Sequence, residues 1–189
     1  ATSPVKLQEE VLRGHPVYGI PIIALHEGYP GHHLQLVYSN RTKRKIRKLF
    51  GSSVFAEGWA LYCEEMMAEV GFYSDPRTKL LKLKDQLWRA CRIIIDIGLH
   101  TEKINFDEAV NILVNDAKLE RVHAEKEVTR YTFTPTQPLS YLIGKKQILE
   151  FRHDYETKLG RSFRLKDFHD QLLSFGTIPV VLIREAMGV

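Results

Sequence analysis

Cysteine and long apolar runs are both scarce in this sequence of 189 residues. Its two cysteines, Cys63 and Cys91, fall on expected helices of a chain too large to need a disulfide staple, so we expect reduced thiols; the alternative is a disulfide between them if those helices are neighbours. No apolar stretch approaches the roughly 18 residues that cross a membrane, and residues 1–4 do not resemble a signal peptide. The default expectation is therefore a cytoplasmic protein with no membrane partner, although the location is otherwise unknown.

Strand patterns and internal repeats are absent as well. The chain has no alternating β-branched runs bounded by turns, and its apolar residues instead recur at helical spacing. No repeat or low-complexity tract divides it, and its length suffices for one sizeable core. We therefore predict an all-α protein with a single helical domain over residues 1–189.

An acidic excess is lacking too, because 27 lysines and arginines outnumber 23 aspartates and glutamates and give a net charge of +4. Much of the excess lies in residues 41–48. This run has no interleaved aromatic side chains and belongs to no nucleic-acid-binding motif, so we interpret it as solvated surface. Charge thus indicates no nucleic-acid partner, and it leaves the oligomeric state open.

Capping signals divide the chain into helices. Ser52 or Ser53 is the expected N-cap of one helix, and Asp75 with Pro76 begins another. The helix from Pro76 is rich in leucine and isoleucine, so we expect it to be central and largely buried. The expected helices span about 5–13, 18–39 with an interruption at Pro30-Gly31, 53–70, 76–103, 106–117, 119–131, 139–159, 165–174 and 180–187.

The densest chemical pattern is residues 26–33, which read His-Glu-Gly-Tyr-Pro-Gly-His-His. In the motif H-E-x-x-H, two histidines one helical turn apart bind zinc and the intervening glutamate is the general base. This sequence misses that spacing, because Pro30 stands four residues after His26. On an unbroken helix His32 would lie about 240° around from His26, and His33 about 10 Å further along the axis. A regular helix therefore gives no site.

Pro30 and Gly31 suggest how the spacing is restored. Proline cannot donate to the carbonyl of His26, and glycine tolerates backbone angles that other residues avoid. A bulge that absorbs two residues gives His26 and His32 the geometry of an i, i+4 pair and directs Glu27 at a metal-activated water. His33 is the alternative second ligand, because one of two adjacent histidines must point elsewhere.

A catalytic zinc usually takes three protein ligands and leaves one position for water or substrate. Glu57, on the next strong helix, is the expected third ligand if the two helices pair antiparallel. The alternative is that Glu57 is a helix N-terminal carboxylate satisfied by the helix dipole. Glu64, two turns later, either orients a ligand histidine or is exposed.

Two further blocks follow this motif, namely residues 57–62 and Arg130-Tyr131 with Pro135, Gln137, Tyr141 and Gly144. Together the three blocks resemble the bacterial family called domain of unknown function 885. That family resembles zincin metallopeptidases with a His-His-Glu site, which implies that His26, His32 and Glu57 bind zinc and that Glu27 is the base. Complete members are longer, which implies that this chain is the C-terminal catalytic part of a longer protein.

The resemblance implies a zinc-dependent hydrolase that acts on a peptide substrate, either a carboxypeptidase or an oligopeptidase. Tyr141 is the expected donor to the oxyanion, with Tyr131 in reserve. Arg130 or Arg152 could hold a substrate carboxylate. The alternative interpretation is a non-catalytic, metal-stabilised helical binding module, or an incomplete fragment without activity.

Overall fold

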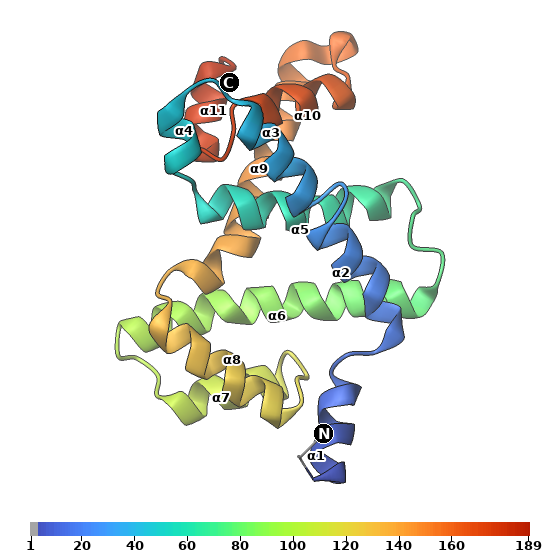
Figure 1. The fold of residues 1–189 in the computed structure, drawn as a ribbon, viewed down its shortest axis with the longest axis vertical. Helices are drawn as coiled ribbons and strands as arrows, with labels where there is room; N and C mark the ends of the chain where they lie inside the picture. The colour runs from blue at the N-terminus through green and yellow to red at the C-terminus, as the bar shows by residue number, and fades with distance from the viewer. Residues whose placement is uncertain (1–3) are drawn as a thin grey trace. The chain divides into compact units, whose positions relative to one another are not determined.

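A computed structural model describes residues 4–189, and every regular element in that range is a helix (Figure 1). The prediction of an all-α protein is confirmed. The helices form two compact units: the chain up to Ile22 with Gly71–Leu139, and Ile23–Val70 with Ser140–Val189. The single domain over residues 1–189 stays a prediction.

The first unit is built around α6 (Pro76–His100), which packs against α7 (Phe106–Asn115) and α8 (Arg121–Phe133). As expected, the side chain of Asp75 caps α6 by accepting a hydrogen bond from the Arg77 amide at 2.8 Å. The unit also contains α1 (Val5–Arg13) and the short helix η1 (Val17–Gly19). Its core includes Ile95, Val110, Leu113, Val128 and Tyr131.

Helix α6 is less buried than the sequence suggested. Apolar residues occur on several sides of this helix, and α7 and α8 pack on only part of its surface. Five leucine and isoleucine side chains of α6, separated in turn by three, four, seven and three residues, are 47–67% exposed. We call this set the α6 stripe; its members are Leu80, Leu83, Leu87, Ile94 and Ile97.

The second unit is organised around α5 (Ser53–Glu69), against which α3 (His32–Arg41) packs. The side chain of Ser52 caps α5 by accepting a hydrogen bond from the Phe55 amide. Helix α10, whose bounds are Leu165–Ser174, also packs against α3. The remaining helices of this unit are α4 (Lys45–Leu49), η2 (Gly160–Ser162) and α11 (Val180–Ala186).

The unit boundary falls within two helices, α2 (Ile20–Glu27) and α9 (Gln137–Leu159), so each gives residues to both units. In the second unit, α9 meets α5 at two glycines. A Cβ on Gly144 would lie 1.8 Å from the Val54 carbonyl oxygen and 2.7 Å from the Gly58 Cα. Only glycine allows this approach. The contact holds α9 directly against α5 at Gly144.

Both cysteines, Cys63 and Cys91, are free and buried. Among the helices of residues 4–189, none combines the length and apolarity that a membrane span requires.

Candidate metal centre

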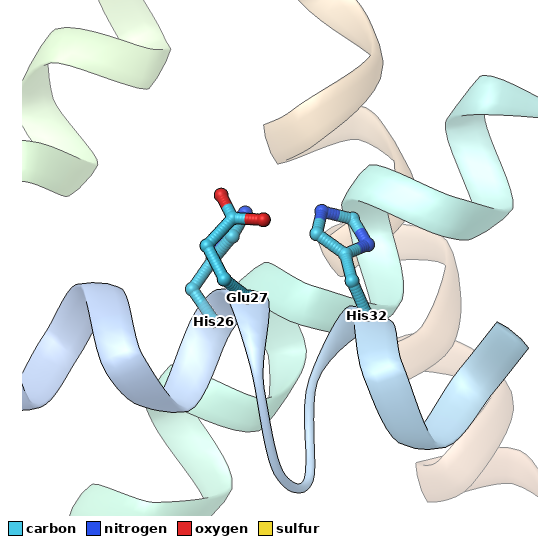
Figure 2. Close-up of side chains that lie close together, drawn as sticks. All are labelled: His26, Glu27 and His32. Carbon is cyan, nitrogen blue, oxygen red and sulfur yellow. The ribbon is translucent and has the colours of Figure 1, made fainter. Parts of the chain in front are cut away.

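The motif residues stand on either side of a turn between two helices. His26 and Glu27 lie at the end of α2, and His32 is the first residue of α3 (Figure 2). The turn between them, residues 28–31, contains a cis Tyr29–Pro30 bond. The expected single helix with an internal bulge is therefore wrong. Pro30 has no amide hydrogen with which to continue α2, and the chain begins a new helix at His32.

Gly31 fixes the shape of this turn. Its amide donates to the Leu25 carbonyl at 3.1 Å, which folds the chain back over the end of α2. A Cβ at this position would lie 1.9 Å from the His26 carbonyl oxygen. The turn is therefore compatible only with glycine at position 31, and it returns His32 to the side of His26.

The turn brings the predicted side chains together. The ligand atoms of His26, Glu27 and His32 all lie within 4.8 Å of one another. The two imidazole rings are nearly perpendicular, with centroids 4.8 Å apart. From α5, Glu57 Oε2 lies 3.3 Å from His32 Nε2 and 3.9 Å from His26 Nε2. Two carboxylates thus lie close to the pair of imidazoles, Glu27 from α2 and Glu57 from α5.

A buried carboxylate fixes the orientation of His26. Its Nδ1 lies 2.7 Å from Glu64 Oε1, and the residues are only 6% and 1% exposed. With Nδ1 placed against this carboxylate, Nε2 is the nitrogen that faces Glu57. A carboxylate behind a ligand histidine is the usual outer partner of a protein zinc site.

Glu57 is not a helix N-terminal carboxylate, because α5 begins at Ser53 and has no acidic residue in its first turn. Burial raises the pKa of Glu57, but hydrogen bonds with His26, His32 and Tyr141 outweigh burial and hold the pKa at about 2. The ring of Tyr141, on α9, stacks 6.4 Å from that of His26. Glu57 is therefore ionised and points at both imidazoles.

This donor set fits zinc. Two imidazoles and a carboxylate are the ligands of many catalytic zinc sites, and three ligands leave a fourth position for substrate or water. Among residues 4–189, the one group of at least three histidine, cysteine or acidic side chains whose ligand atoms all lie within 4.8 Å of one another is His26, Glu27 and His32; Glu57 adjoins this group through its contacts with the two histidines. Glu27 is the most exposed member and is available for proton transfer.

Other predicted site residues lie apart from this cluster. His33 is exposed on α3 and does not belong to the group of convergent ligands. Arg152 donates to Glu69 at 2.9 Å and to the Tyr62 hydroxyl at 3.4 Å. Arg152 is thus already engaged in an ion pair within the second unit.

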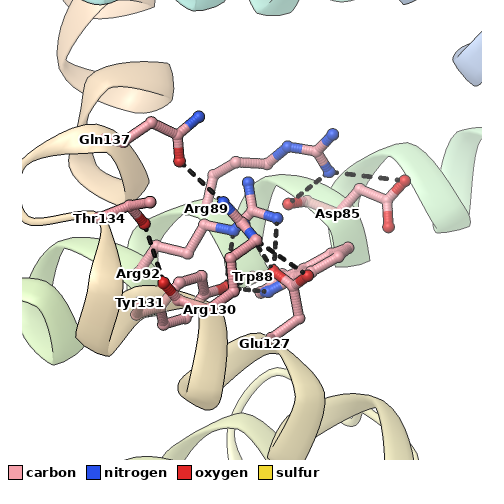
Figure 3. A network of polar contacts seen from close by, with 9 residues as sticks. All are labelled: Asp85, Trp88, Arg89, Arg92, Glu127, Arg130, Tyr131, Thr134 and Gln137. Carbon is pink, nitrogen blue, oxygen red and sulfur yellow. Dashed lines mark hydrogen bonds and ion pairs between the residues drawn. The ribbon is translucent and has the colours of Figure 1, made fainter.

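Arg130 and Tyr131 belong to the first unit, where they join a polar network (Figure 3). The Tyr131 hydroxyl accepts from Arg92 Nε at 2.9 Å and from Trp88 Nε1 at 3.1 Å, and it donates to Glu127 at 2.8 Å. Arg130 donates to the same Glu127 carboxylate at 2.9 Å. Burial raises the pKa of Tyr131 to about 12. These contacts explain Tyr131 as a structural residue of its own unit.

Sequence reasoning missed the role of Trp59. Its Nε1 donates to the Pro30 carbonyl at 3.0 Å, and Cys63 approaches the same oxygen at 3.5 Å. Both residues are buried on α5. That helix therefore supplies Glu57 and also holds the turn at residues 28–31. The one hint in the sequence was that Trp59 lies two positions after Glu57, and the sequence alone does not show that it contacts the turn.

Two solved structures resemble this chain along most of its length. One, described as a "putative lipoprotein of unknown function" from Shewanella oneidensis, is 34% identical with a TM-score of 0.89, and the match covers 99% of this chain and 34% of that one. The other, a "putative lipoprotein" from Colwellia psychrerythraea, is 31% identical with a TM-score of 0.87, and the match covers 92% of this chain and 30% of that one. This chain thus spans about a third of the length of either.

No curated protein matches the chain. The model of a family described as "Bacterial protein of unknown function (DUF885)" matches residues 3–187, and the chain belongs to that family.

Proposed function

We propose that this chain binds zinc through His26, His32 and Glu57 and hydrolyses peptide bonds. The observation that carries the proposal is the buried contact between Glu64 and His26 Nδ1, which leaves Nε2 beside His32 and Glu57. Placing a carboxylate at 1% exposure is costly unless it is satisfied, and orienting a metal ligand accounts for it.

The ion would polarise a peptide carbonyl and lower the pKa of water. Glu27, which adjoins the ligands and is exposed, takes a proton from the attacking water and delivers it to the leaving amine. Tyr141, which contacts Glu57, donates a hydrogen bond to the developing oxyanion. Glu64 keeps His26 in one orientation during these steps.

Of the two peptidase types, the contacts favour the oligopeptidase. A carboxypeptidase needs a cation that can receive the C-terminal carboxylate of its substrate. Arg152 is bound to Glu69, and Arg130 is bound to Glu127 and Gln137. Because each guanidinium already has a carboxylate partner, neither supports recognition of a chain end.

The second candidate is a metal-stabilised binding module without activity of its own. The chain spans about a third of the length of its solved relatives, so part of a substrate cleft can belong to residues outside it. This favours the second candidate.

The description of both relatives as lipoproteins favours lipid attachment of this protein over the cytoplasmic default.

Glu27→Gln separates the two candidates, with Glu150→Gln, at an exposed residue of α9, as the matched control. The measurements are zinc content and cleavage of a mixed peptide library. We expect wild type and Glu150→Gln to cleave, and Glu27→Gln to keep zinc but lose about 100-fold or more in turnover. Undiminished cleavage by Glu27→Gln would contradict the mechanism. Zinc binding without cleavage by any variant would favour the binding module.

A further inference from the structure

A groove of about 410 Å³ lies in the second unit and is lined in part by the turn at residues 28–31. Its volume is within the range of small-ligand sites in proteins. Tyr29 and Pro30 of the turn form part of its wall, and Pro30 is also held by Trp59. The other lining side chains are mostly apolar or aromatic and include Leu34, Tyr38, Trp59 and Leu173.

His169, which lines the groove, carries a hydrogen-bond donor. Burial raises the pKa of Tyr62, so its hydroxyl keeps its proton, and that hydroxyl lies 2.7 Å from His169 Nε2. Arg152 donates to the same hydroxyl oxygen at 3.4 Å, which directs the hydroxyl proton to His169. Burial also lowers the pKa of His169 to about 4, so the imidazole is neutral near pH 7. Nε2 is therefore the acceptor, and Nδ1 carries the hydrogen.

His169 Nδ1 has no hydrogen-bond partner within residues 4–189, and His169 lines the groove. The charged side chains at the groove, Lys166 and Asp170, form an ion pair with each other. Tyr38 also donates to Asp170, at 3.4 Å. These charges cancel, so the groove favours a neutral ligand that combines an apolar group with a hydrogen-bond acceptor.

We propose that this groove binds one large apolar side chain of a peptide, preferably an aromatic one, whose adjacent main-chain carbonyl accepts a hydrogen bond from His169. The peptide as ligand rests on the proposed function. The aromatic wall recognises the side chain by area and ring contact. Tyr29 and Pro30 belong both to the groove and to the turn between His26 and His32, so a peptide held there contacts the turn that positions the candidate metal centre.

The probes are N-acetyl-phenylalanine amide and N-acetyl-alanine amide, titrated into the chain and followed by chemical-shift changes. We expect the phenylalanine probe to bind roughly tenfold to a hundredfold more tightly, because it buries a larger apolar side chain. Equal affinity for the two probes would overturn the proposal.

Leu34→Trp fills the groove, and Leu36→Trp, on the same helix but exposed and not lining the groove, is its matched control. Leu34→Trp should remove at least about tenfold of the affinity for the phenylalanine probe, and Leu36→Trp should leave it unchanged. His169→Phe keeps a ring but removes the donor, and it should weaken binding roughly threefold to tenfold. Unchanged binding by both Leu34→Trp and His169→Phe would also overturn the proposal.

The titrations are made with the metal-free chain and with the zinc-loaded chain, so that the groove and the metal centre are judged separately. Selective binding of the phenylalanine probe without any zinc uptake would support the groove and refute the metal centre. Zinc uptake without selective binding would refute the groove alone. Loss of the circular-dichroism signal in Leu34→Trp leaves His169→Phe and the two-probe comparison as the deciding measurements.

Discussion

Among single residues, Glu64 offers a sharp test of the proposed metal centre, because it touches His26 without being a proposed ligand. Glu64→Gln keeps the size of the side chain but removes its charge, so the hydrogen bond to Nδ1 becomes weaker. We expect zinc affinity to fall about 10- to 100-fold, as is typical when the outer partner of a ligand histidine is lost. Isothermal titration with zinc measures this change.

His33→Ala is the companion measurement at the same scale. His33 is exposed beside His32, so its removal should leave zinc affinity unchanged, whereas His32→Ala should abolish zinc binding. A loss of affinity in His33→Ala equal to that in His32→Ala would mean that the second ligand has been assigned to the wrong histidine.

His169 predicts how stability depends on pH. Its pKa in the folded chain is about 4, below its ordinary value of 6.5. Between these values the unfolded chain binds a proton that the folded chain does not, so the free energy of unfolding falls as the pH drops through this window and is fully recovered above it. The His169 contribution is about 1 kcal/mol per pH unit.

Urea denaturation near pH 7 and near pH 5 checks this expectation. His169→Gln should lose less stability between the two conditions than wild type, because glutamine does not titrate. His153→Gln, which changes an exposed histidine on α9, is the control and should behave like wild type. An equal loss in wild type and His169→Gln would contradict the assignment.

The sequence pattern predicted which site side chains would meet, and the structure brings His26, Glu27, His32 and Glu57 together. Their roles stay predictions. That these side chains lie close together was predictable, because metal sites use few residue types at few sequence spacings. The neutral donor at His169 was not, because it depends on a contact with Tyr62 from a helix 107 residues away in sequence.

At the scale of elements, the turn between α2 and α3 is the most sensitive segment. Gly31→Ala places a Cβ 1.9 Å from the His26 carbonyl oxygen, so the turn must open and the two histidines must separate. We expect a loss of about 1 to 3 kcal/mol in the free energy of unfolding, together with weakened zinc binding. Urea denaturation and zinc titration measure the two effects.

Gly19→Ala is the matched control, because no atom lies within 4 Å of the position that its Cβ would take. This substitution should leave both stability and zinc affinity close to wild type. If Gly31→Ala and Gly19→Ala behave alike, the close approach at Gly31 does not determine the site.

Helix bounds were predictable where local signals stood alone. The Ser52 cap and the Asp75-Pro76 start give α5 and α6 their first residues, and the bounds of α1 and α10 agree with the spacing of their apolar residues. The turn at residues 28–31 was not predictable as a full break, because a lone Pro-Gly pair fits a kinked helix equally well. The choice between kink and break is made by contacts with Trp59 and Cys63 on another helix.

For the molecule as a whole, the α6 stripe predicts an unusual contrast between neighbouring residues. Ile94 is 61% exposed, whereas Ile95 is 0% exposed. Ile95→Ala should cost about 2 to 5 kcal/mol, because it leaves a cavity in the core of the first unit. Ile94→Ala should change stability by no more than about 0.5 kcal/mol. Chemical denaturation of both variants measures the contrast, and a similar cost at both positions would mean that the stripe is covered in solution.

The division into two units could not be predicted from the sequence. Tyr131 and Tyr141 are ten positions apart and belong to one sequence block, yet Tyr131 is fixed in the network of the first unit and Tyr141 contacts Glu57 in the second. Which residues share a unit depends on long-range helix pairing, and helical periodicity carries no information on partners.

The meeting of Gly58 and Gly144 limits what either position can accept. A Cβ on Gly58 would lie 2.4 Å from the Gly144 carbonyl carbon, and one on Gly144 would lie 1.8 Å from the Val54 carbonyl oxygen. Any side chain at either position would therefore push the two helices apart and draw Tyr141, which is close to Gly144 in the chain, away from Glu57, which precedes Gly58.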